Sequence, residues 1–151
     1  MNKIFITLIM PFLFVTQINA QQAGTKARLT FEHWNCSILI QFMNDSDQKK
    51  LAGKGIEHFE KGYKYVLEMY KELENPNTNQ EKNWSENAPL FFRWAMPAPN
   101  HEFGAGRLYE ATNQNTGDEV SKDSNGEYID QGLWPGRAKN TYNERNCKIL
   151  N

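Results

Sequence analysis

The sequence predicts a mainly α-helical protein, a small bundle around one long amphipathic helix, with a loop-rich C-terminal half and one disulfide. Three observations support this fold class. Apolar or small residues recur every three or four positions across residues 45–73, which is the spacing of one helical face. A second segment, residues 28–43, is apolar around most of a helical circumference and is therefore expected to be buried. Two cysteines, Cys36 and Cys147, lie far apart in the chain.

The N-terminus is typical of a secretory signal. Lys3 supplies a positive charge, residues 4–15 form an apolar stretch, and Ala20 is a small residue suited to cleavage. The alternative, an uncleaved membrane anchor, would need a run of about 20 apolar residues, which this segment lacks. We therefore expect a signal peptide over residues 1–20, a single helical domain over residues 21–151, and a periplasmic or secreted location.

Composition argues against several classes of partner. Seventeen Lys and Arg residues face 18 Asp and Glu residues, so the formal net charge is only −1. Such a balance provides no electrostatic footprint for nucleic acid or for an anionic membrane surface. Aromatic residues are spread through the chain, which argues against disorder. We expect a folded protein without nucleic-acid binding and without stable membrane insertion after signal cleavage.

The cysteine count fits an exported protein. Two cysteines in an oxidising compartment predict one disulfide, between Cys36 and Cys147. The alternatives are two free thiols or a catalytic redox pair, but redox pairs usually stand close together as Cys-x-x-Cys. Closing so long a loop is worth about 4–5 kcal/mol as an upper figure in the chain-entropy model.

The first half of the chain is predicted to form a polar leader followed by two helices. Residues 21–26 are expected to be mobile, and residues 28–43 to be helical, although Ile38 and Ile40 leave a strand possible over residues 37–42. Ser46 is the expected N-cap of the long helix. The predicted inner face of that helix comprises Ala52, Ile56, Phe59, Tyr63, Val66, Tyr70 and Leu73.

The long helix is also expected to have a charged face and a row of glycines. Glu57 and Lys61, and likewise Glu60 and Lys64, stand four apart with the acid first, which indicates a solvated face. Gly55, Gly62 and Met69 form a row seven residues apart. Because glycine inside a helix costs about 1 kcal/mol relative to alanine, we expect the first or the last helix to cross closely at this row. The alternative is that Gly53 and Gly55 mark a frayed or kinked first turn.

The second half is less regular. The sequence predicts a short helix over residues 88–96, a helix over residues 101–113 capped by Asn100, and a loop over residues 115–126 with a turn at Asn125-Gly126. Phe103, Leu108 and Ala111 are the expected inner face of the middle helix, with Gly104 and Gly106 allowing close approach. A second turn is expected over residues 133–136. A weak helix over residues 137–147 then depends for docking on the disulfide and on Tyr142.

No catalytic, metal or cofactor motif is visible. Zinc needs three or four ligands at workable spacing, and neither a Cys-x-x-Cys nor an HExxH pattern is present. Residues 121–127 resemble a calcium loop only loosely, because the twelfth position from Ser121 is Gly132 and not an acid. No Gly-x-Ser-x-Gly elbow occurs. His33 is expected to be an ordinary helix residue near solvent. We expect no cofactor and no metal, and favour a protein without enzymatic activity.

One cluster has the composition of a binding surface. Aromatic residues, Met and Arg are enriched at protein interfaces. Arg93, Trp94, Arg107 and Tyr109 are therefore the candidate partner-binding residues, although most aromatic residues of such a cluster also suit a core. A groove lined by Trp94, Phe103 and Tyr109 would instead suit a small molecule or a cell-envelope component. Two acids, or an acid and a histidine, converging in a cleft would favour a hydrolase of envelope polymers.

In outline, a small exported helical domain with one cysteine in its first helix and one late in the chain is similar to several periplasmic immunity or inhibitor proteins. One such group protects bacteria from amidase toxins delivered by type VI secretion. The similarity covers architecture, so it assigns no functional residue here. We expect an exported, non-catalytic binding protein whose partner is another protein, such as a secreted enzyme or toxin. The alternatives are a small-molecule or envelope-binding module and an envelope-polymer hydrolase.

Overall fold

The computed structural model describes residues 15–74, 84, 86–95 and 98–150, and across these residues the protein is mainly α-helical, as predicted. Within them, no helix combines the length and the apolar character that a membrane span requires. The elements, in chain order, are α1 (Val15–Phe42), α2 (Asp45–Leu73), α4 (Leu90–Ala95), α5 (His101–Ser121), the 3₁₀ helix η1 (Gln131–Leu133) and α6 (Trp134–Glu144).

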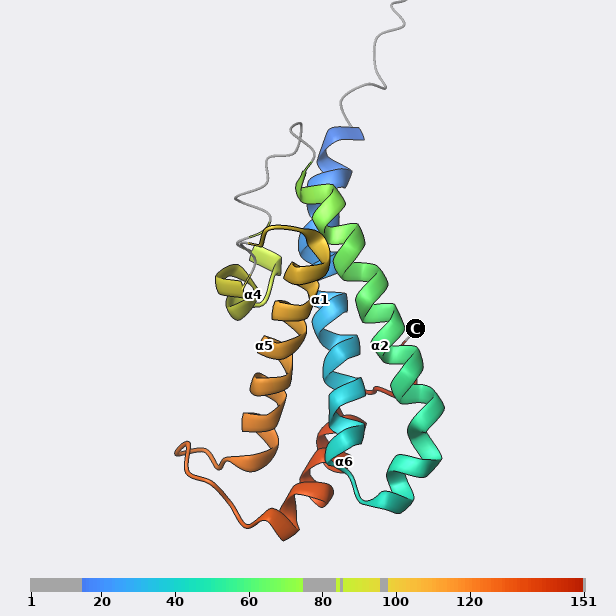
Figure 1. The fold of residues 1–151 in the computed structure, drawn as a ribbon, viewed down its shortest axis with the longest axis vertical. Helices are drawn as coiled ribbons and strands as arrows, with labels where there is room; N and C mark the ends of the chain where they lie inside the picture. The colour runs from blue at the N-terminus through green and yellow to red at the C-terminus, as the bar shows by residue number, and fades with distance from the viewer. Residues whose placement is uncertain (1–14, 75–83, 85, 96–97, 151) are drawn as a thin grey trace, which may run out of the picture.

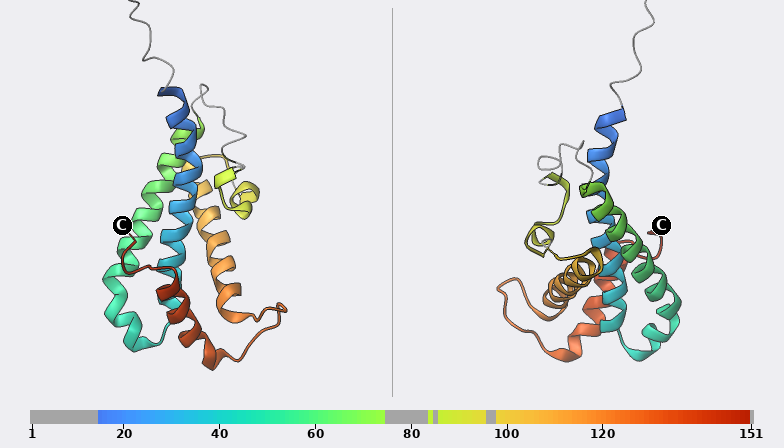
Figure 2. Two further views of the ribbon diagram at one scale, coloured as in Figure 1. Left: turned by 180° about the vertical axis from the view of Figure 1, so that it is seen from behind. Right: turned by 45° about the horizontal axis from the view of Figure 1, so that its top comes forward.

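α1 is the central helix of the bundle (Figure 1). α2 returns antiparallel beside it after a short connection, and α5 runs along its other side. α4 packs on α5, whereas α6 crosses the lower end of α1 on the face that Figure 2 shows from behind. α2 and α5 approach each other at one end of the bundle and diverge toward the other, so part of α1 lies between them without a covering helix.

The core consists of two clusters along α1. The upper cluster joins Trp34 and Ile38 to Val66 and Met69 of α2 and to Leu108 of α5. The lower cluster surrounds the two cysteines and joins α1 to the end of α5 and to α6, through Leu39, Met43, Val120, Ala138 and Tyr142. Because α1 contributes to both clusters, it determines where the other helices pack.

The predicted disulfide is confirmed. Cys36 in the middle of α1 is bonded to Cys147, which follows α6, and the two Cα atoms are 5.7 Å apart. Both cysteines are buried, and Tyr142 beside them is also buried, as expected for the residue that docks the last helix. The bond therefore attaches the C-terminal segment to the central helix.

The sequence located the long helix correctly but not its cap. α2 covers Asp45–Leu73, yet its N-cap is Asn44, whose side chain accepts a hydrogen bond of 2.9 Å from the amide of Asp47. The predicted cap, Ser46, lies inside the first turn. Asn44 is the better cap because its extended backbone lets the amide oxygen reach back to a free N–H of the first turn.

The predicted close crossing at the glycine row is confirmed at Gly62. A Cβ atom at this position would overlap the indole of Trp34, so α1 crosses α2 there. Gly55 is less crowded, since its nearest neighbour is the side chain of Ile40 at 3.6 Å, and Gly53 faces open space. Gly104 of α5 makes a second close approach, against the ring of Tyr70, whereas Gly106 does not.

Two expectations for the N-terminal part are wrong. Residues 21–26 belong to α1 instead of forming a mobile leader, and Lys26 pairs with Glu68 of α2. Residues 37–42 are helical, so the strand alternative fails. Contacts with α2 accompany both segments: Lys26 pairs with Glu68, and the Ser37 hydroxyl donates to the Gly55 carbonyl.

The C-terminal half is more helical than predicted. α5 begins at His101 behind its predicted Asn100 cap but continues to Ser121, through half of the expected loop. Thr112, Thr116 and Val120 are buried at helical spacing, and this burial against the core explains how a polar sequence continues the helix. The hydroxyl of Thr112 is satisfied by donating to the Leu108 carbonyl.

The two predicted turns have different outcomes. The turn at Asn125-Gly126 is confirmed, with Gly126 at a positive φ of 82°. The expected turn at residues 133–136 is instead helical, since Leu133 ends η1 and α6 begins at Trp134 with Pro135 in its first turn.

Candidate functional site

The apolar row of α2 is only partly covered by the rest of the protein. Val66 and Tyr70 are buried, but Ile56 is 61% exposed and Phe59 is 41% exposed. The predicted inner face is therefore wrong in the first half of α2, where His58 and Gly62 face α1 instead. Large exposed apolar residues that share one face mark a surface available for binding.

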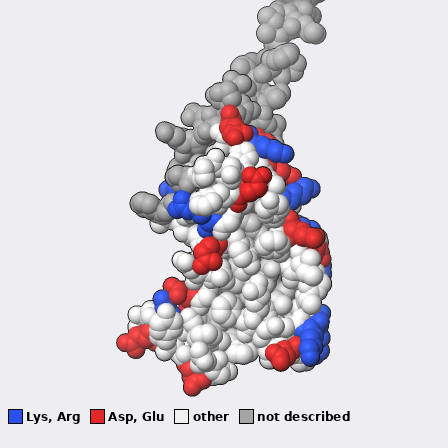
Figure 3. Space-filling view, viewed as in Figure 1, with Lys and Arg blue, Asp and Glu red and all other residues white. Residues whose placement is uncertain are grey.

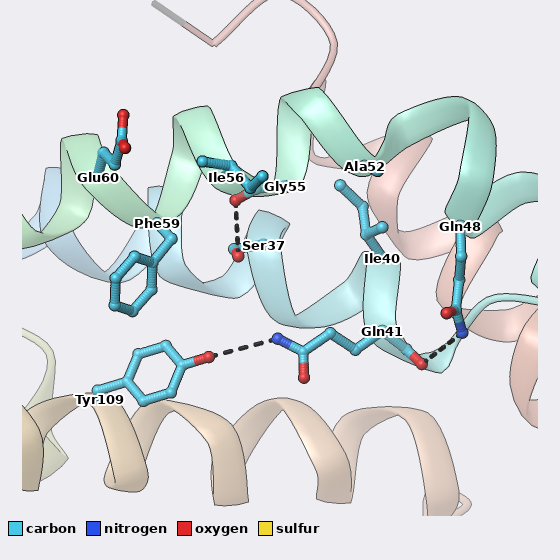
Figure 4. A pocket seen from close by; sticks show the side chains of 10 residues that line it. All are labelled: Ser37, Ile40, Gln41, Gln48, Ala52, Gly55, Ile56, Phe59, Glu60 and Tyr109. Atoms are coloured by element: carbon cyan, nitrogen blue, oxygen red, sulfur yellow. Dashed lines mark hydrogen bonds between the residues drawn. The ribbon is translucent and has the colours of Figure 1, made fainter.

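A groove lies beside these exposed residues. Its volume is about 440 Å³, and it is bounded by α1, by the first half of α2 and by Tyr109 of α5. Ile40 and Gln41 of α1 lie at its floor, and the side chains of Phe59 and Tyr109 point toward each other at one end of it (Figure 4). The groove forms where α2 and α5 diverge and leave one side of α1 uncovered.

The polar groups on the groove floor are already hydrogen-bonded within the protein. The Ser37 hydroxyl donates to the Gly55 carbonyl at 2.9 Å. Gln48 Nε2 donates to the carbonyls of Gln41 at 2.9 Å and Met43 at 2.7 Å. These bonds hold α2 against α1 and satisfy carbonyls near the helix ends. The surface that remains is mostly apolar, with few hydrogen-bonding groups left for a ligand.

Tyr109 anchors the α5 side of the groove. Its ring meets Phe59 edge-on, with the ring centroids 5.4 Å apart, and meets Trp34 in the same way at 5.4 Å. Gln41 Nε2 approaches the Tyr109 hydroxyl at 3.4 Å, which is a long hydrogen bond. The ring is thus fixed by packing, whereas its hydroxyl keeps the capacity to donate to a bound group.

Charges lie at the margins of this surface. Figure 3 shows that the middle of the face between α5 and α2 carries no Lys, Arg, Asp or Glu, while charged side chains gather around it. Glu60 is the single charged residue among those that line the groove. An occupant would meet apolar side chains along most of the groove and one carboxylate at its end.

The four candidate partner-binding residues do not form one surface around the groove. Tyr109 lines it, whereas Arg93 and Arg107 are exposed on α4 and α5 outside it. The Trp94 side chain lies outside the described part of the structure. Phe103, which was expected on the inner face of α5, is exposed. Because the Trp94 side chain is not described, the small-molecule groove of Trp94, Phe103 and Tyr109 stays a prediction.

The structure contains a pair of buried histidines that the sequence did not predict. His33, expected near solvent, is fully buried, and so is His58 of α2. Their Nδ1 atoms are 2.9 Å apart, and His58 Nε2 lies 3.0 Å from the carbonyl oxygen of Cys147. Burial lowers the pKa of His33 to about 4, with smaller effects from the charges of His58 and Lys61, and burial also lowers the pKa of His58.

One signal in the sequence could have located this pair. His58 stands three residues after Gly55 and four before Gly62, so it lies on the glycine face that was predicted to meet another helix. A histidine on that face is expected to be buried. The partner residue on α1 follows only from the register of the two helices, which the spacing alone does not determine.

An acid and a histidine also meet at the surface. His101 Nε2 lies 2.7 Å from Glu74 Oε1, and the imidazole ring stacks on Tyr70 with the centroids 5.0 Å apart. Glu74 is well exposed, so this pair lies on the surface at the end of α2. Within the described residues, no group of three or more His, Cys, Asp or Glu side chains is arranged to hold a metal ion.

Comparisons with protein families, with curated proteins and with solved structures gave no match to this chain.

Proposed function

We propose that the protein is an exported, non-catalytic binding protein that holds a segment of a partner protein in the groove between α1, α2 and α5. The observation that carries this proposal is the uncovered apolar row of α2, where Ile56 and Phe59 border a groove of about 440 Å³. Burying such side chains against a partner gains about 25 cal/mol for each Å² removed from water. An inhibitor or immunity protein for a secreted enzyme or toxin is the setting we favour.

The chemistry of the groove favours a helical segment over an extended one. An extended segment would need hydrogen-bond partners for its own backbone, usually at the edge of a sheet. The groove offers few, because Ser37 and Gln48 are already bonded to backbone carbonyls. A helix satisfies its own backbone and could pack on the uncovered side of α1, against Ile40 and Ile56. We expect its buried face to be apolar, with a Lys or Arg placed near Glu60.

Export is part of the proposal. A signal-like N-terminus and a single long-range disulfide together favour a periplasmic or secreted location, where thiols are oxidised. A small-molecule or cell-envelope binding module is the second candidate. The groove volume lies within the usual 300–1,000 Å³ range of ligand pockets, which favours this candidate. The lining side chains come from three helices, and most of their polar groups are already bonded within the protein, which favours the apolar face of a helix over a small polar ligand.

The test compares two exposed isoleucines. Ile56→Asp places a charge in the groove, whereas Ile149→Asp is a matched control on an exposed isoleucine that does not line the groove. A partner captured from the envelope of the source cells would be purified, and its affinity for each variant measured by calorimetry. We expect Ile56→Asp to weaken binding at least 10-fold and Ile149→Asp to leave it unchanged. Equal affinity of both variants would contradict the proposal.

A further inference from the structure

Three segments that are distant in the chain meet at one buried chain of hydrogen bonds. His33 belongs to α1, His58 to the first half of α2, and Cys147 to the turn after α6. The two Nδ1 atoms are 2.9 Å apart, and His58 Nε2 is 3.0 Å from the Cys147 carbonyl oxygen. Both imidazoles are fully buried. The contact therefore holds α1, α2 and the C-terminal turn together at one point.

The geometry assigns the protons of this chain. A carbonyl oxygen only accepts hydrogen bonds, so His58 Nε2 must carry a proton and donate to Cys147. A neutral His58 then has a bare Nδ1, which accepts from a protonated His33 Nδ1. His33 Nε2 is left bare, and within the described residues this buried atom has no hydrogen-bond partner. At neutral pH both rings are thus uncharged, and His33 Nδ1 donates its proton in a hydrogen bond to His58 Nδ1.

An additional proton does not fit this arrangement. If both Nδ1 atoms carried protons they would repel each other, so a singly protonated pair must place its new N–H at His33 Nε2. There it would be a buried donor without an acceptor, and the pair would carry a buried positive charge. Both conditions cost free energy, because burial of an unpaired donor or an unpaired charge is unfavourable.

We propose that the chain of His33, His58 and the Cys147 carbonyl is an acid-sensitive latch. It is closed when both imidazoles are neutral and, on acidification, it releases the first half of α2 from α1 and from the C-terminal turn. The disulfide keeps the turn tethered through Cys36, so the release is local and reversible. The opened segments expose the imidazoles to water, where each can hold its proton.

The charged groups around the latch do not offset its burial. Burial has the largest effect on the pKa of His58 and lowers it. The hydrogen bond to the Cys147 carbonyl and the charge of Glu57 raise this pKa by less, and the charges of Lys54 and Lys61 lower it further. Tyr65 of α2 contributes a ring near His33, and Tyr142 of α6 lies near the same Lys54 and Glu57. The pKa of His33 is about 4, against 6.5 for a free histidine. The free energy that favours the closed latch over the open one is therefore fully present above about pH 6.5 and decreases as the pH falls toward 4.

Hydrogen–deuterium exchange tests the latch with the full chain. The pKa of His33 is about 4 in the closed state and 6.5 once the ring is exposed to water. Proton linkage then predicts that the equilibrium constant for opening rises about 20-fold between pH 7 and pH 5. After correction for intrinsic exchange, amides around His58 and Cys147 should show this increase, and those of the upper core around Leu108 should not. The double variant His33→Gln/His58→Gln keeps a donor and an acceptor at each position but removes both titrating groups, so it should remove the increase. His101→Gln, which changes the one histidine outside the latch, should retain it.

Nuclear magnetic resonance of the unmodified protein provides a second test, which does not depend on any variant folding. Nitrogen chemical shifts should place the proton of His33 on Nδ1 and that of His58 on Nε2 at pH 7, and His33 should titrate near pH 4. Protons on Nε2 of both rings, titration of His33 near 6.5, or exchange that is independent of pH would overturn the proposal.

The latch also bears on the groove. His58 lies between Ile56 and Phe59 in α2, so release of this stretch would displace one groove wall. This consequence rests on the proposed function, whereas the latch itself does not. A partner that binds equally well at pH 7 and pH 5 would contradict only the regulation of binding. A protein that binds no partner at any pH, yet opens on acidification, would contradict only the proposed function.

Discussion

The contact between Gly62 and Trp34 shows how single residues set the distance between the two longest helices. The indole lies where a Cβ of residue 62 would be, and its Nε1 donates to the Phe59 carbonyl at 3.2 Å. Trp34 is almost fully buried, so it has little room to move. The glycine is therefore needed for packing at this point, despite its cost inside a helix.

Gly62→Ala should destabilise the protein, because the new methyl group would overlap a buried ring. Overpacking of this kind typically costs about 1–3 kcal/mol. Gly53→Ala is the matched control in the same helix, since a Cβ there meets nothing within 4 Å. This control should stabilise the protein by up to about 1 kcal/mol through helix propensity. Urea unfolding of both variants measures the difference, and equal effects of the two would contradict the close crossing.

At the scale of the element, the first half of α2 explains why the sequence predicted the helix but not its buried face. The spacing from Ala52 to Leu73 identifies one apolar face correctly, but periodicity does not reveal which neighbour covers it. α1 packs on the side of His58 and Gly62, and α5 diverges, so Ile56 and Phe59 remain exposed. This difference between prediction and structure is what identifies the groove.

The cap of α2 provides a test of an element boundary. Asn44→Ala removes the side-chain oxygen that accepts from the Asp47 amide and should cost about 1 kcal/mol of unfolding free energy. Ser46→Ala changes the cap that the sequence favoured and, since Ser46 lies inside the first turn, should change stability by less than about 0.5 kcal/mol. Thermal unfolding of the two variants distinguishes them. A larger loss for Ser46→Ala would place the helix start two residues later.

At the scale of the whole molecule, the fold was largely predictable and the site was not. The disulfide, the long helix and the docking of Tyr142 follow from local patterns or from the only possible cysteine pairing. The groove and the histidine pair depend on how α1, α2 and α5 are placed in space. Tyr109 illustrates this limit, because its aromatic character suggested a binding surface but its true neighbours, Trp34 and Phe59, come from two other helices.

The disulfide decides how far the molecule can open. Cys147→Ser removes a cross-link over a sequence separation of 111 residues, which the chain-entropy model values at about 4–5 kcal/mol. In oxidising buffer the variant should melt about 10 °C or more below the wild type. In reducing buffer the two should melt together. Equal melting of the wild type with and without reductant would contradict a stabilising role for the bond.

The same variant separates the cross-link from the latch. Cys147→Ser keeps the backbone carbonyl that accepts from His58, so the acid-dependent release of the C-terminal turn should persist. Without the tether to Cys36, however, the released turn would be free to move away together with α6, whose docking depends on the lower core around Tyr142. Exchange of the α6 amides should therefore become strongly acid-dependent in the variant. In the wild type the disulfide should keep the same amides protected at pH 5.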